Sequence, residues 1–514
     1  KDDDGKFFIP VDRLDEIVTE QTIRKELKTL SVGQKKDRHT LAGQIWRAPS
    51  SKQKTTRRKI FAVLALMQKI DSILDFIEEG VYDNRLPFVY AEDQVEVCCK
   101  KTGQPIKLFQ DKARWKPHEK DLFQTYQWWM MTPYFQLSCE GEKTVRRMPV
   151  EDLAVLPFTD VKTTSEGGFS VVRKVKIHSA HHNAQDFSVQ PVHFAVKTLN
   201  FQADANDLEN QEVQSLIRLN NENHPNLIRL LMTFQHKKHL HLVFPWADGN
   251  LQDFWSKKYP DPNYPLRDYD LARWMAQQCL GLALGLRAIH HNCVDESQAQ
   301  EQGLEPDAAQ KKYGKHGDFK PENILWFKQS GATSANSVTG VLKVSDFGFA
   351  DFHASASKSD IPRDNVLGIT PTYRAPEWDV QRNVAPSYDL WCFGCVLLEF
   401  VVWFLRGWQG VQEFMNKRLA DSVHEIPGYE EDKFFNLDPH ARQDIRKAVA
   451  KNSVRTEIQD LRQHEKCSDF ILDLLDHVED YLLRMRPEKR ASCDNTVSVL
   501  QRIVEKCFAD AKYC

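Results

Sequence analysis

The sequence predicts an α+β protein of more than one domain, in which a mostly helical N-terminal region precedes a region of short strands and helices. Apolar residues recur at helical spacing over residues 11–30 and 60–77. Short apolar runs at 194–197 and 324–327 are typical of strands, and residues 406–466 are expected to add extra helices. A chain of 514 residues exceeds the ~250–300 residues that one hydrophobic core usually supports.

The composition is that of an ordinary globular protein, with 41% hydrophobic and 27% charged residues. A formal net charge of −3 gives no global field toward nucleic acid or a membrane, so we expect neither partner. No run reaches the ~18 apolar residues of a membrane span. The cysteines are scattered, and Cys392-x-x-Cys395 has no second pair nearby. This favours buried thiols in a reducing compartment, and we expect a soluble intracellular protein, in the cytoplasm or the nucleus.

Three features favour structural explanations over binding functions. Residues 38–59 are basic, but Trp46 is their only aromatic residue, which favours a solvated loop over a nucleic-acid contact. The aromatic cluster around Trp115 indicates core packing, or a seam against the following region, rather than a ligand site. Two adjacent histidines, His181 and His182, cannot easily face one metal ion, and we expect both to be exposed to solvent.

The most informative stretch reads His316-Gly317-Asp318-Phe319-Lys320-Pro321-Glu322-Asn323. It places an acid, a lysine and an asparagine at the spacing that phosphoryl transfer uses. Asp318 can accept the proton of an attacking hydroxyl, Lys320 can neutralise the transferring phosphate, and Asn323 can hold a magnesium ion. The alternative is a polar turn ahead of the strand expected at 324–327.

Further motifs follow in order. Asp346 begins Asp346-Phe347-Gly348 after an apolar strand expected at 341–344, and it would hold the magnesium that bridges the terminal phosphates. By itself an Asp-x-Gly is usually a turn. Here Ala375-Pro376-Glu377 and the D-x-W-x-x-G of 389–394 come next, and small-molecule phosphotransferases lack these last two elements.

The upstream half supplies candidate nucleotide contacts. Ala195 and Lys197 form a strand-like A-x-K, whose lysine would hold the α- and β-phosphates. Glu212, at the head of an amphipathic helix, is the expected partner of Lys197. The alternative is an ordinary surface ion pair, which would contribute little.

A glycine-rich turn and a hinge complete the candidate nucleotide site. Gly167, Gly168 and Val172 align with G-x-G-x-x-G-x-V, with serine in place of the first and third glycines. The glycines let backbone amides approach phosphates. Phe244 is the bulky residue expected behind the adenine, and the backbone N–H of Ala247 is the expected donor, because Pro245 has none.

Residues from about 157 to 510 resemble a eukaryotic-type protein kinase domain. The glycine after His316 and two further stretches resemble kinase-like proteins of filamentous fungi that carry a helical N-terminal region: Pro321-Glu322-Asn323-Ile324-Leu325-Trp326-Phe327 and Ala350-Asp351-Phe352-His353. The resemblance implies a two-lobed fold with ATP in the cleft. It implies a β-rich small lobe at about 156–247 and a helical large lobe at about 248–510, after an N-terminal domain of residues 1–155.

Lys320 is the choice of the serine/threonine class, so the resemblance implies an ATP- and Mg²⁺-dependent kinase acting on serine or threonine hydroxyls of a protein. A regulatory protein at the N-terminal domain is an expected partner. The runner-up is a pseudokinase scaffold, favoured by the two missing glycines. A small-molecule phosphotransferase is a third hypothesis, which is based on the sequence His316-Gly317-Asp318. The kinase pattern also predicts a Glu377–Arg490 pair and a stack of Leu216, Leu230, His316 and Phe347.

Overall fold

The computed structural model describes residues 5–29, 38–48, 55–91, 96–138, 142, 144–166, 170–184, 192–199, 216–220, 223–261, 269–291, 314–328, 340–346, 371–381, 385–423, 430–437 and 448–514. They fall into two compact units. Unit 1 consists of Lys1–Cys139, Arg146–Gln202 and Leu231–Val243, and unit 2 of Glu140–Val145, Ala203–Leu230 and Phe244–Cys514. The division of the chain into folding domains at residue 155 remains a prediction.

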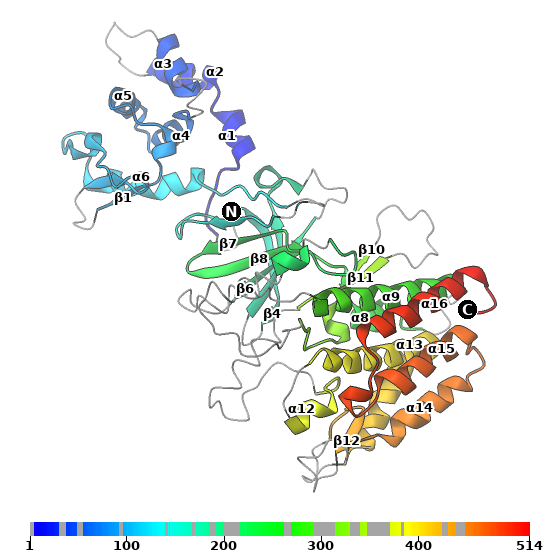
Figure 1. Cartoon of the computed structure of the whole chain (residues 1–514). Helices are drawn as coiled ribbons and strands as arrows, with labels where there is room; N and C mark the ends of the chain where they lie inside the picture. The colour runs from blue at the N-terminus through cyan, green and yellow to red at the C-terminus, as the bar shows by residue number, and fades with distance from the viewer. Residues whose placement is uncertain are drawn as a thin grey trace. The chain divides into compact units, whose positions relative to one another are not determined.

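The N-terminal part of unit 1 is mostly helical (Figure 1). Its elements are α1 (Val11–Ile17), α2 (Glu20–Glu26), α3 (Arg38–Trp46), α4 (Arg58–Leu66), α5 (Ile73–Glu78), α6 (Pro117–Gln127) and an antiparallel pair of β1 (Phe88–Tyr90) with β2 (Val97–Cys99). Its core is aromatic: Phe109 and Trp115 are both buried, and their ring centroids lie 4.6 Å apart. The prediction of core packing around Trp115 is confirmed.

The single helix predicted over 60–77 is wrong, because the chain breaks in its middle. α4 ends at Leu66, and Gln68 then takes a left-handed φ of 55°, which interrupts a right-handed helix. After a 3-10 turn, α5 begins at Ile73. Both helices bury apolar side chains in the same core, so the apolar periodicity continues across the break.

A six-stranded sheet forms the other part of unit 1. Its strands are β3 (Arg147–Pro149), β4 (Phe158–Glu166), β5 (Ser170–Ile177), β6 (Phe194–Leu199), β7 (Met232–His236) and β8 (His239–Pro245), in the order β3-β7-β8-β6-β5-β4. β3 runs parallel to β7, whereas the β4–β5, β5–β6 and β7–β8 pairs are antiparallel. Val175 and Ile177 alternate onto one face of β5, and both join a core that includes Phe135 and Phe234.

The segment between β5 and β6, residues 178–184, joins the sheet to the N-terminal part of unit 1. The expectation that His181 and His182 are exposed is wrong: only 3% and 9% of their surfaces reach solvent. The backbone N–H of Val11 donates to His181 Nε2 at 3.1 Å, and His181 Nδ1 donates to the Pro133 carbonyl at 2.9 Å. Asn183 completes the junction through two hydrogen bonds with the backbone of Leu137.

Unit 2 is mainly helical. Its elements are β9 (Gly249–Asn250), α8 (Leu251–Asp253), α9 (Tyr269–His291), β10 (Ile324–Lys328), β11 (Gly340–Val344), α12 (Pro376–Gln381), α13 (Pro386–Ala420), β12 (Phe435–Leu437), β13 (Ala448–Ala450), α14 (Asn452–Arg462), α15 (Asp469–His477) and α16 (Cys493–Ala509). β10 lies between β11 and β9, and both pairs are antiparallel. α16, in red, packs along α9 (Figure 1).

α13 is the central helix of unit 2. Within the described residues it alone is long and apolar enough to cross a membrane, but its apolar window is wholly buried inside the protein, as in a core helix. Cys392 and Cys395 are buried thiols within it, and burial raises the pKa of both. The prediction of extra helices over 406–466 is only partly correct. α13 is interrupted by a kink at Gly407, where φ is +71° and not helical, and its second part ends at Ala420. The antiparallel β12–β13 pair then precedes α14.

Candidate active site

The loop at residues 314–323 is anchored to α13 by a buried carboxylate. Asp389 Oδ2 accepts the backbone N–H of His316 at 2.8 Å, and Asp389 Oδ1 accepts that of Gly317 at 2.8 Å. His290 Nε2 lies 2.9 Å from Asp389 Oδ2. Burial by itself would raise the pKa of Asp389, but the hydrogen bonds from His290 and His316 lower it overall. An ionised carboxylate inside the protein therefore anchors the backbone of this loop.

The backbone conformation in the middle of this loop explains why residue 317 is a glycine. Its φ is +81°, in the left-handed region that glycine enters without steric penalty. This conformation turns two successive amides, those of His316 and Gly317, toward the same carboxylate of Asp389. Asp318 follows immediately, and its own N–H donates to His316 Nδ1 at 3.2 Å.

The three candidate residues of the loop lie together. Lys320 Nζ is 2.7 Å from Asp318 Oδ2. Asn323 Nδ2 donates both to the carbonyl of Asp318 at 2.8 Å and to its Oδ2 at 3.0 Å. The Asp318 and Lys320 side chains are 20% and 14% exposed, so they are sheltered but reachable. A carboxylate, an ammonium group and an amide thus converge on one partly open position.

Asn323 and Asp346 lie at the same end of the β10–β11 hairpin. Ile324 pairs with Val344 at the hairpin end, and Ser345 donates through N and Oγ to the Asn323 carbonyl at 2.8 and 2.9 Å. Asp346 then turns with a φ of 58°. Asn323 Nδ2 is used toward Asp318, and the side-chain oxygens of Asn323 and Asp346 are of the kind that Mg²⁺ prefers as ligands, so these two residues could hold the ion. These residues fit a magnesium ion. The described residues hold no cluster of three or more His, Cys, Asp or Glu suited to a metal.

Asn226 supports this hairpin from outside the loop, a role that sequence reasoning missed. Its Nδ2 donates to the Leu342 carbonyl at 2.9 Å, and its carbonyl accepts the N–H of Val344 at 2.8 Å. A Cβ at Gly281 of α9 would lie 2.4 Å from the Asn226 side chain. The signal was His224-Pro225-Asn226, which we interpreted only as a turn. His290 was likewise missed, because nothing in the sequence links it to Asp389.

The candidate nucleotide residues are divided between the two units. In unit 1, Lys197 of β6 is 6% exposed and stands opposite Val172 of β5, two positions along the strand from Ala195. In unit 2, Phe244 and Ala247 are half-buried at and just beyond the end of β8. The remaining three candidates lie outside the described residues: Gly167, Gly168 and Glu212.

The predicted Glu377–Arg490 pair is confirmed. Arg490 Nη1 and Nη2 lie 2.6 and 2.7 Å from the two carboxylate oxygens of Glu377, and both side chains are buried. Such a two-pronged pair fixes the start of α12 against the C-terminal helices. Of the predicted stack, Leu216, Leu230 and His316 are buried, and Phe347 lies outside the described residues.

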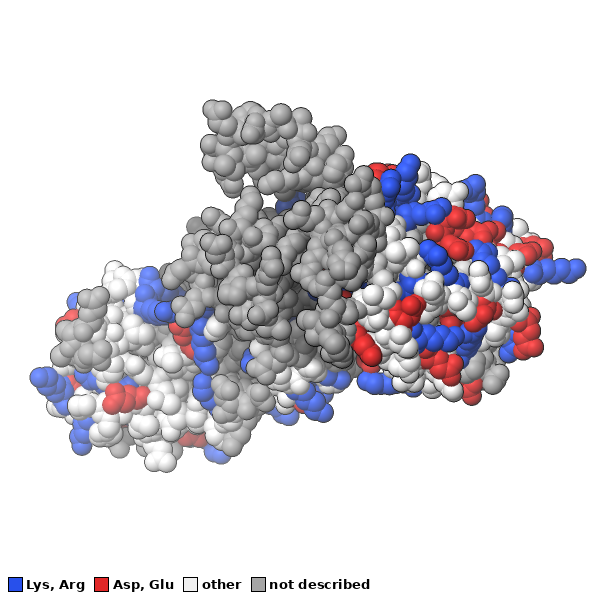
Figure 2. All heavy atoms as spheres, turned by 90° about the horizontal axis from the view of Figure 1, so that it is seen from below, with Lys and Arg blue, Asp and Glu red and all other residues white. Residues whose placement is uncertain are grey.

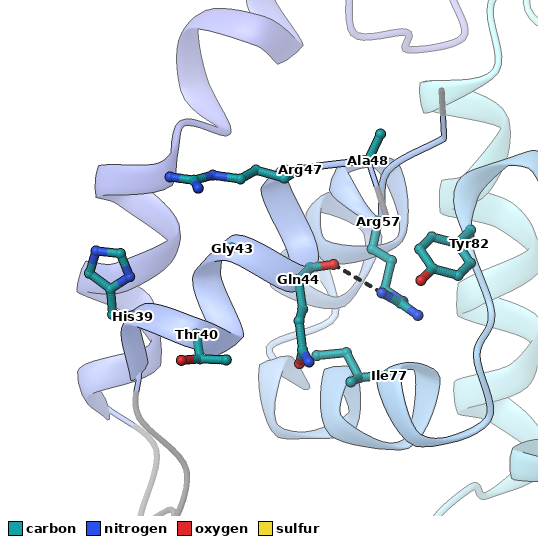
Figure 3. A pocket seen from close by; sticks show the side chains of 9 residues that line it. All are labelled: His39, Thr40, Gly43, Gln44, Arg47, Ala48, Arg57, Ile77 and Tyr82. Atoms are coloured by element: carbon teal, nitrogen blue, oxygen red, sulfur yellow. Dashed lines mark hydrogen bonds between the residues drawn. The ribbon is translucent and has the colours of Figure 1, made fainter. Parts of the chain in front are cut away.

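A cavity of about 460 Å³ lies elsewhere, in the N-terminal part of unit 1 (Figure 3). Arg57 forms its wall, stacked 3.6 Å over the Tyr82 ring and donating to the carbonyls of Gln44 and Val81. Those contacts account for the buried guanidinium, and no candidate site residue lines the cavity. On the face shown in Figure 2, the basic and acidic side chains of the described residues are interspersed.

Comparison with known families agrees with this geometry. The family model described as "Protein kinase domain" matches residues 313–500, which include the loop of Asp318, the β10–β11 hairpin and the Glu377–Arg490 pair. The chain therefore contains a protein kinase domain of mixed α/β content.

Its curated relatives are protein kinases. Cyclin-dependent kinase 7 of Dictyostelium discoideum is 29% identical over 180 residues, 35% of this chain and 38% of the relative. Cyclin-dependent kinase 4 of Xenopus laevis is 30% identical over 213 residues, 40% and 54% of the two chains. Homeodomain-interacting protein kinase 1 of Mus musculus is 29% identical over 239 residues, 45% and 16%. The chain thus spans at most about half the length of these relatives.

Proposed function

We propose that this chain is an ATP- and magnesium-dependent protein kinase that transfers the γ-phosphate of ATP to serine or threonine hydroxyls. The observation that carries the proposal is the convergence of Asp318, Lys320 and Asn323 in one hydrogen-bonded loop, with Asp346 at the end of the paired hairpin. The similarity to protein kinases supports it.

Each residue of the loop has a distinct task in the proposed reaction. The Asp318 carboxylate takes the proton of the acceptor hydroxyl as the new O–P bond forms and the β–γ bridge breaks. Lys320, already beside Asp318, neutralises negative charge on the transferring group. Asn323 and Asp346 would hold Mg²⁺, which when bound offsets the charge of the terminal phosphates.

Nucleotide binding is proposed for the residues of the upstream kinase motifs. Lys197 holds the α- and β-phosphates, with Glu212 as its partner, and Gly167 and Gly168 present backbone amides to the phosphates. Ala195, Val172 and Phe244 provide apolar contacts to the base, and the N–H of Ala247 donates to it. The position of Lys197 supports this, because it lies opposite Val172 on the neighbouring strand of the same sheet.

We also propose the partners of this chain and its cellular compartment. The substrate is a protein with a serine or threonine acceptor, and a regulatory protein binds the N-terminal part of the chain. Buried thiols such as Cys392 and Cys395 support an intracellular location. The likeness to filamentous-fungal kinase-like proteins remains a proposal that rests on the motif of the loop.

The test is radiolabel transfer from ATP to casein, to the protein itself, and to aminoglycosides or choline. We expect transfer to protein alone. Asp318→Asn should lower it at least ~10²-fold while nucleotide binding persists, because only the proton acceptor is lost. Asp346→Asn should in addition weaken Mg²⁺–ATP binding. Asp480→Asn, which alters a surface pair with Arg484, is the matched control.

Equal transfer by wild type, Asp318→Asn and Asp346→Asn would favour the scaffold over the kinase. Transfer to aminoglycosides or choline, without transfer to protein, would instead favour a small-molecule phosphotransferase.

A further inference from the structure

The chain turns back on itself after α16 and brings two cysteines together. α16 ends at Ala509, and residues 511–513 form a turn. Cys514, which follows the turn, donates through Sγ to the carbonyl of Cys507 at 3.8 Å. The two thiols are also hydrogen-bonded to each other. Cys507 and Cys514, called here the α16 pair, are therefore in direct contact at the end of this helix.

Tyr513 fixes the position of the turn after α16. Its backbone carbonyl accepts the N–H of Phe470, in the first turn of α15, at 2.9 Å, and its side chain is buried. The Tyr513 hydroxyl donates to Asp473 Oδ2 at 2.6 Å, and Lys506 Nζ lies 2.7 Å from the same oxygen. The segment after α16 is thus attached to α15, and this attachment holds the residue after Tyr513 against Cys507.

The two thiols of the α16 pair differ in their access to solvent. Cys507 is wholly buried, whereas Cys514 is half-buried. Burial raises the pKa of the Cys507 thiol, the hydrogen bond with Cys514 raises it further, and the charge of Arg273 opposes the rise. Because only a thiolate is a good nucleophile, Cys507 is protected from an oxidant in solvent. Such an oxidant meets Cys514 first.

The other neighbouring cysteines among the described residues lack this combination. Cys392 and Cys395 stand one turn apart in α13, but both are buried. Cys98 and Cys99 are adjacent in β2, where successive side chains point to opposite faces of the strand, and both are buried as well. Within the described part of the chain, only the α16 pair places a half-buried thiol in contact with a buried one.

We propose that Cys507 and Cys514 are a redox-sensitive modification site, which peroxide converts reversibly into a disulfide that fastens the segment after α16 to that helix. The Cys514 thiolate attacks one oxygen of hydrogen peroxide: an S–O bond forms, the O–O bond breaks, and the departing hydroxide leaves as water. The Cys507 sulfur then attacks the sulfenic sulfur of Cys514, the S–S bond forms, and the S–O bond breaks. The departing hydroxide takes the Cys507 proton as a second water. Two thiols thus give two electrons and two protons to one peroxide.

The disulfide turns a noncovalent attachment into a covalent one. Tyr513 already ties the segment after α16 to α15 through Phe470 and Asp473. Once Cys514 is linked to Cys507, this segment cannot separate from α16, because the bond closes a short loop and removes open conformations. Oxidation therefore makes opening of the contact between α15 and the segment rarer, and a thiol reductant restores the original state.

The first test detects the bond itself. The full chain is treated with hydrogen peroxide, free thiols are blocked with N-ethylmaleimide, and a tryptic digest is analysed by mass spectrometry. Trypsin cleaves after Lys506 and Lys512, so the disulfide links peptide 507–512 to the peptide that begins at Tyr513. We expect this link in wild type, its loss after dithiothreitol, and its absence in Cys514→Ser. Cys467→Ser, which removes the other half-buried thiol among the described residues, is the matched control and should keep the link. Oxidation of Cys514 to a sulfinic acid without the link, or a link to another cysteine, would overturn the proposal.

The second test measures what the bond does. Hydrogen exchange of the Phe470 and Tyr513 amides, which donate to Tyr513 and Asp510, should slow roughly tenfold when wild type is oxidised. The same treatment should leave both amides of Cys514→Ser unchanged. Equal exchange in reduced and oxidised wild type would refute the fastening of this segment. Neither test uses catalytic turnover, so the proposal stands or falls independently of the kinase function.

Discussion

Two short irregular segments, the loop at 314–323 in unit 2 and the 178–184 segment in unit 1, use a buried histidine in the same way. His316 Nε2 donates to the Ser345 carbonyl while Nδ1 accepts the N–H of Asp318. His181 uses the opposite nitrogens, donating through Nδ1 to Pro133 and accepting the N–H of Val11 at Nε2. In each imidazole one nitrogen donates and the other accepts, and this arrangement fixes the tautomer.

The two segments differ in the second side chain that supports their backbone. The loop at 314–323 has a second support, the ionised Asp389, which accepts two of its amides. The 178–184 segment has the uncharged amide of Asn183. A carboxylate keeps its charge down to low pH, whereas an imidazole loses its acceptor nitrogen once protonated. The pH dependence of the junction in unit 1 should therefore come from His181, because the Asn183 amide does not titrate.

The largest effect is expected from removing the charged support. Asp389→Ala leaves the amides of His316 and Gly317 without an acceptor inside the protein, beside His290. We expect the free energy of unfolding of unit 2 to fall by about 3–5 kcal/mol, measured by urea denaturation. Asp480→Ala, which removes an exposed partner of Arg484, should cost far less. Equal losses in the two variants would mean that the loop does not rest on Asp389.

A smaller effect, dependent on pH, is expected at His181. Burial lowers its pKa below the ordinary 6.5 despite the hydrogen bond to Pro133, with the charges of His178 and Lys59 lowering it further and that of Asp12 opposing them. Because the folded pKa is the lower one, the unfolded chain takes up the proton first as pH falls. The stability from this contact is thus complete above pH 6.5 and is lost as pH falls from there toward the folded pKa.

His181→Gln isolates that contribution. At pH 8 the variant should be less stable than wild type by about 1–2 kcal/mol, and the gap should narrow as the pH is lowered to 5. Urea denaturation of unit 1, followed by far-UV circular dichroism, gives both values. A gap that stays constant over this range would show that protonation of His181 does not open the junction.

The smallest effect is expected at Gly317. Gly317→Ala puts a side chain at a φ of +81°, which costs about 1–2 kcal/mol, and the thermal midpoint should drop. Gly43→Ala is the matched control, because α3 has a helical backbone there and its new Cβ would meet nothing within 4 Å. The control should instead gain about 0.5–1 kcal/mol. Shifts of the same sign in the two variants would contradict the assignment of strain to Gly317.

The loop was predictable from sequence and the junction was not. Asp318, Lys320 and Asn323 were identified because their chemistry requires those residue types at that spacing, and the Glu377–Arg490 pair because both ends belong to motifs. His181 has no such requirement. Its burial depends on Val11 and Pro133, which are far away in sequence, and adjacent histidines carry no signal of what covers them. The break at Gln68 was hidden for a related reason, since the same core fixes the apolar residues on both sides.

The short strand β3 matters for how this chain can be divided. Arg147–Pro149 lies along β7 at one border of the six-stranded sheet. An uncovered border strand offers unpaired N–H and C=O groups to other chains, and short, charged, proline-containing strands are a common protection against such self-association. Arg147 and Pro149 give β3 this character. A fragment that began at residue 156 would lose β3 and would leave the hydrogen-bonding edge of β7 uncovered. Such a fragment would tend to aggregate even with every candidate site residue present.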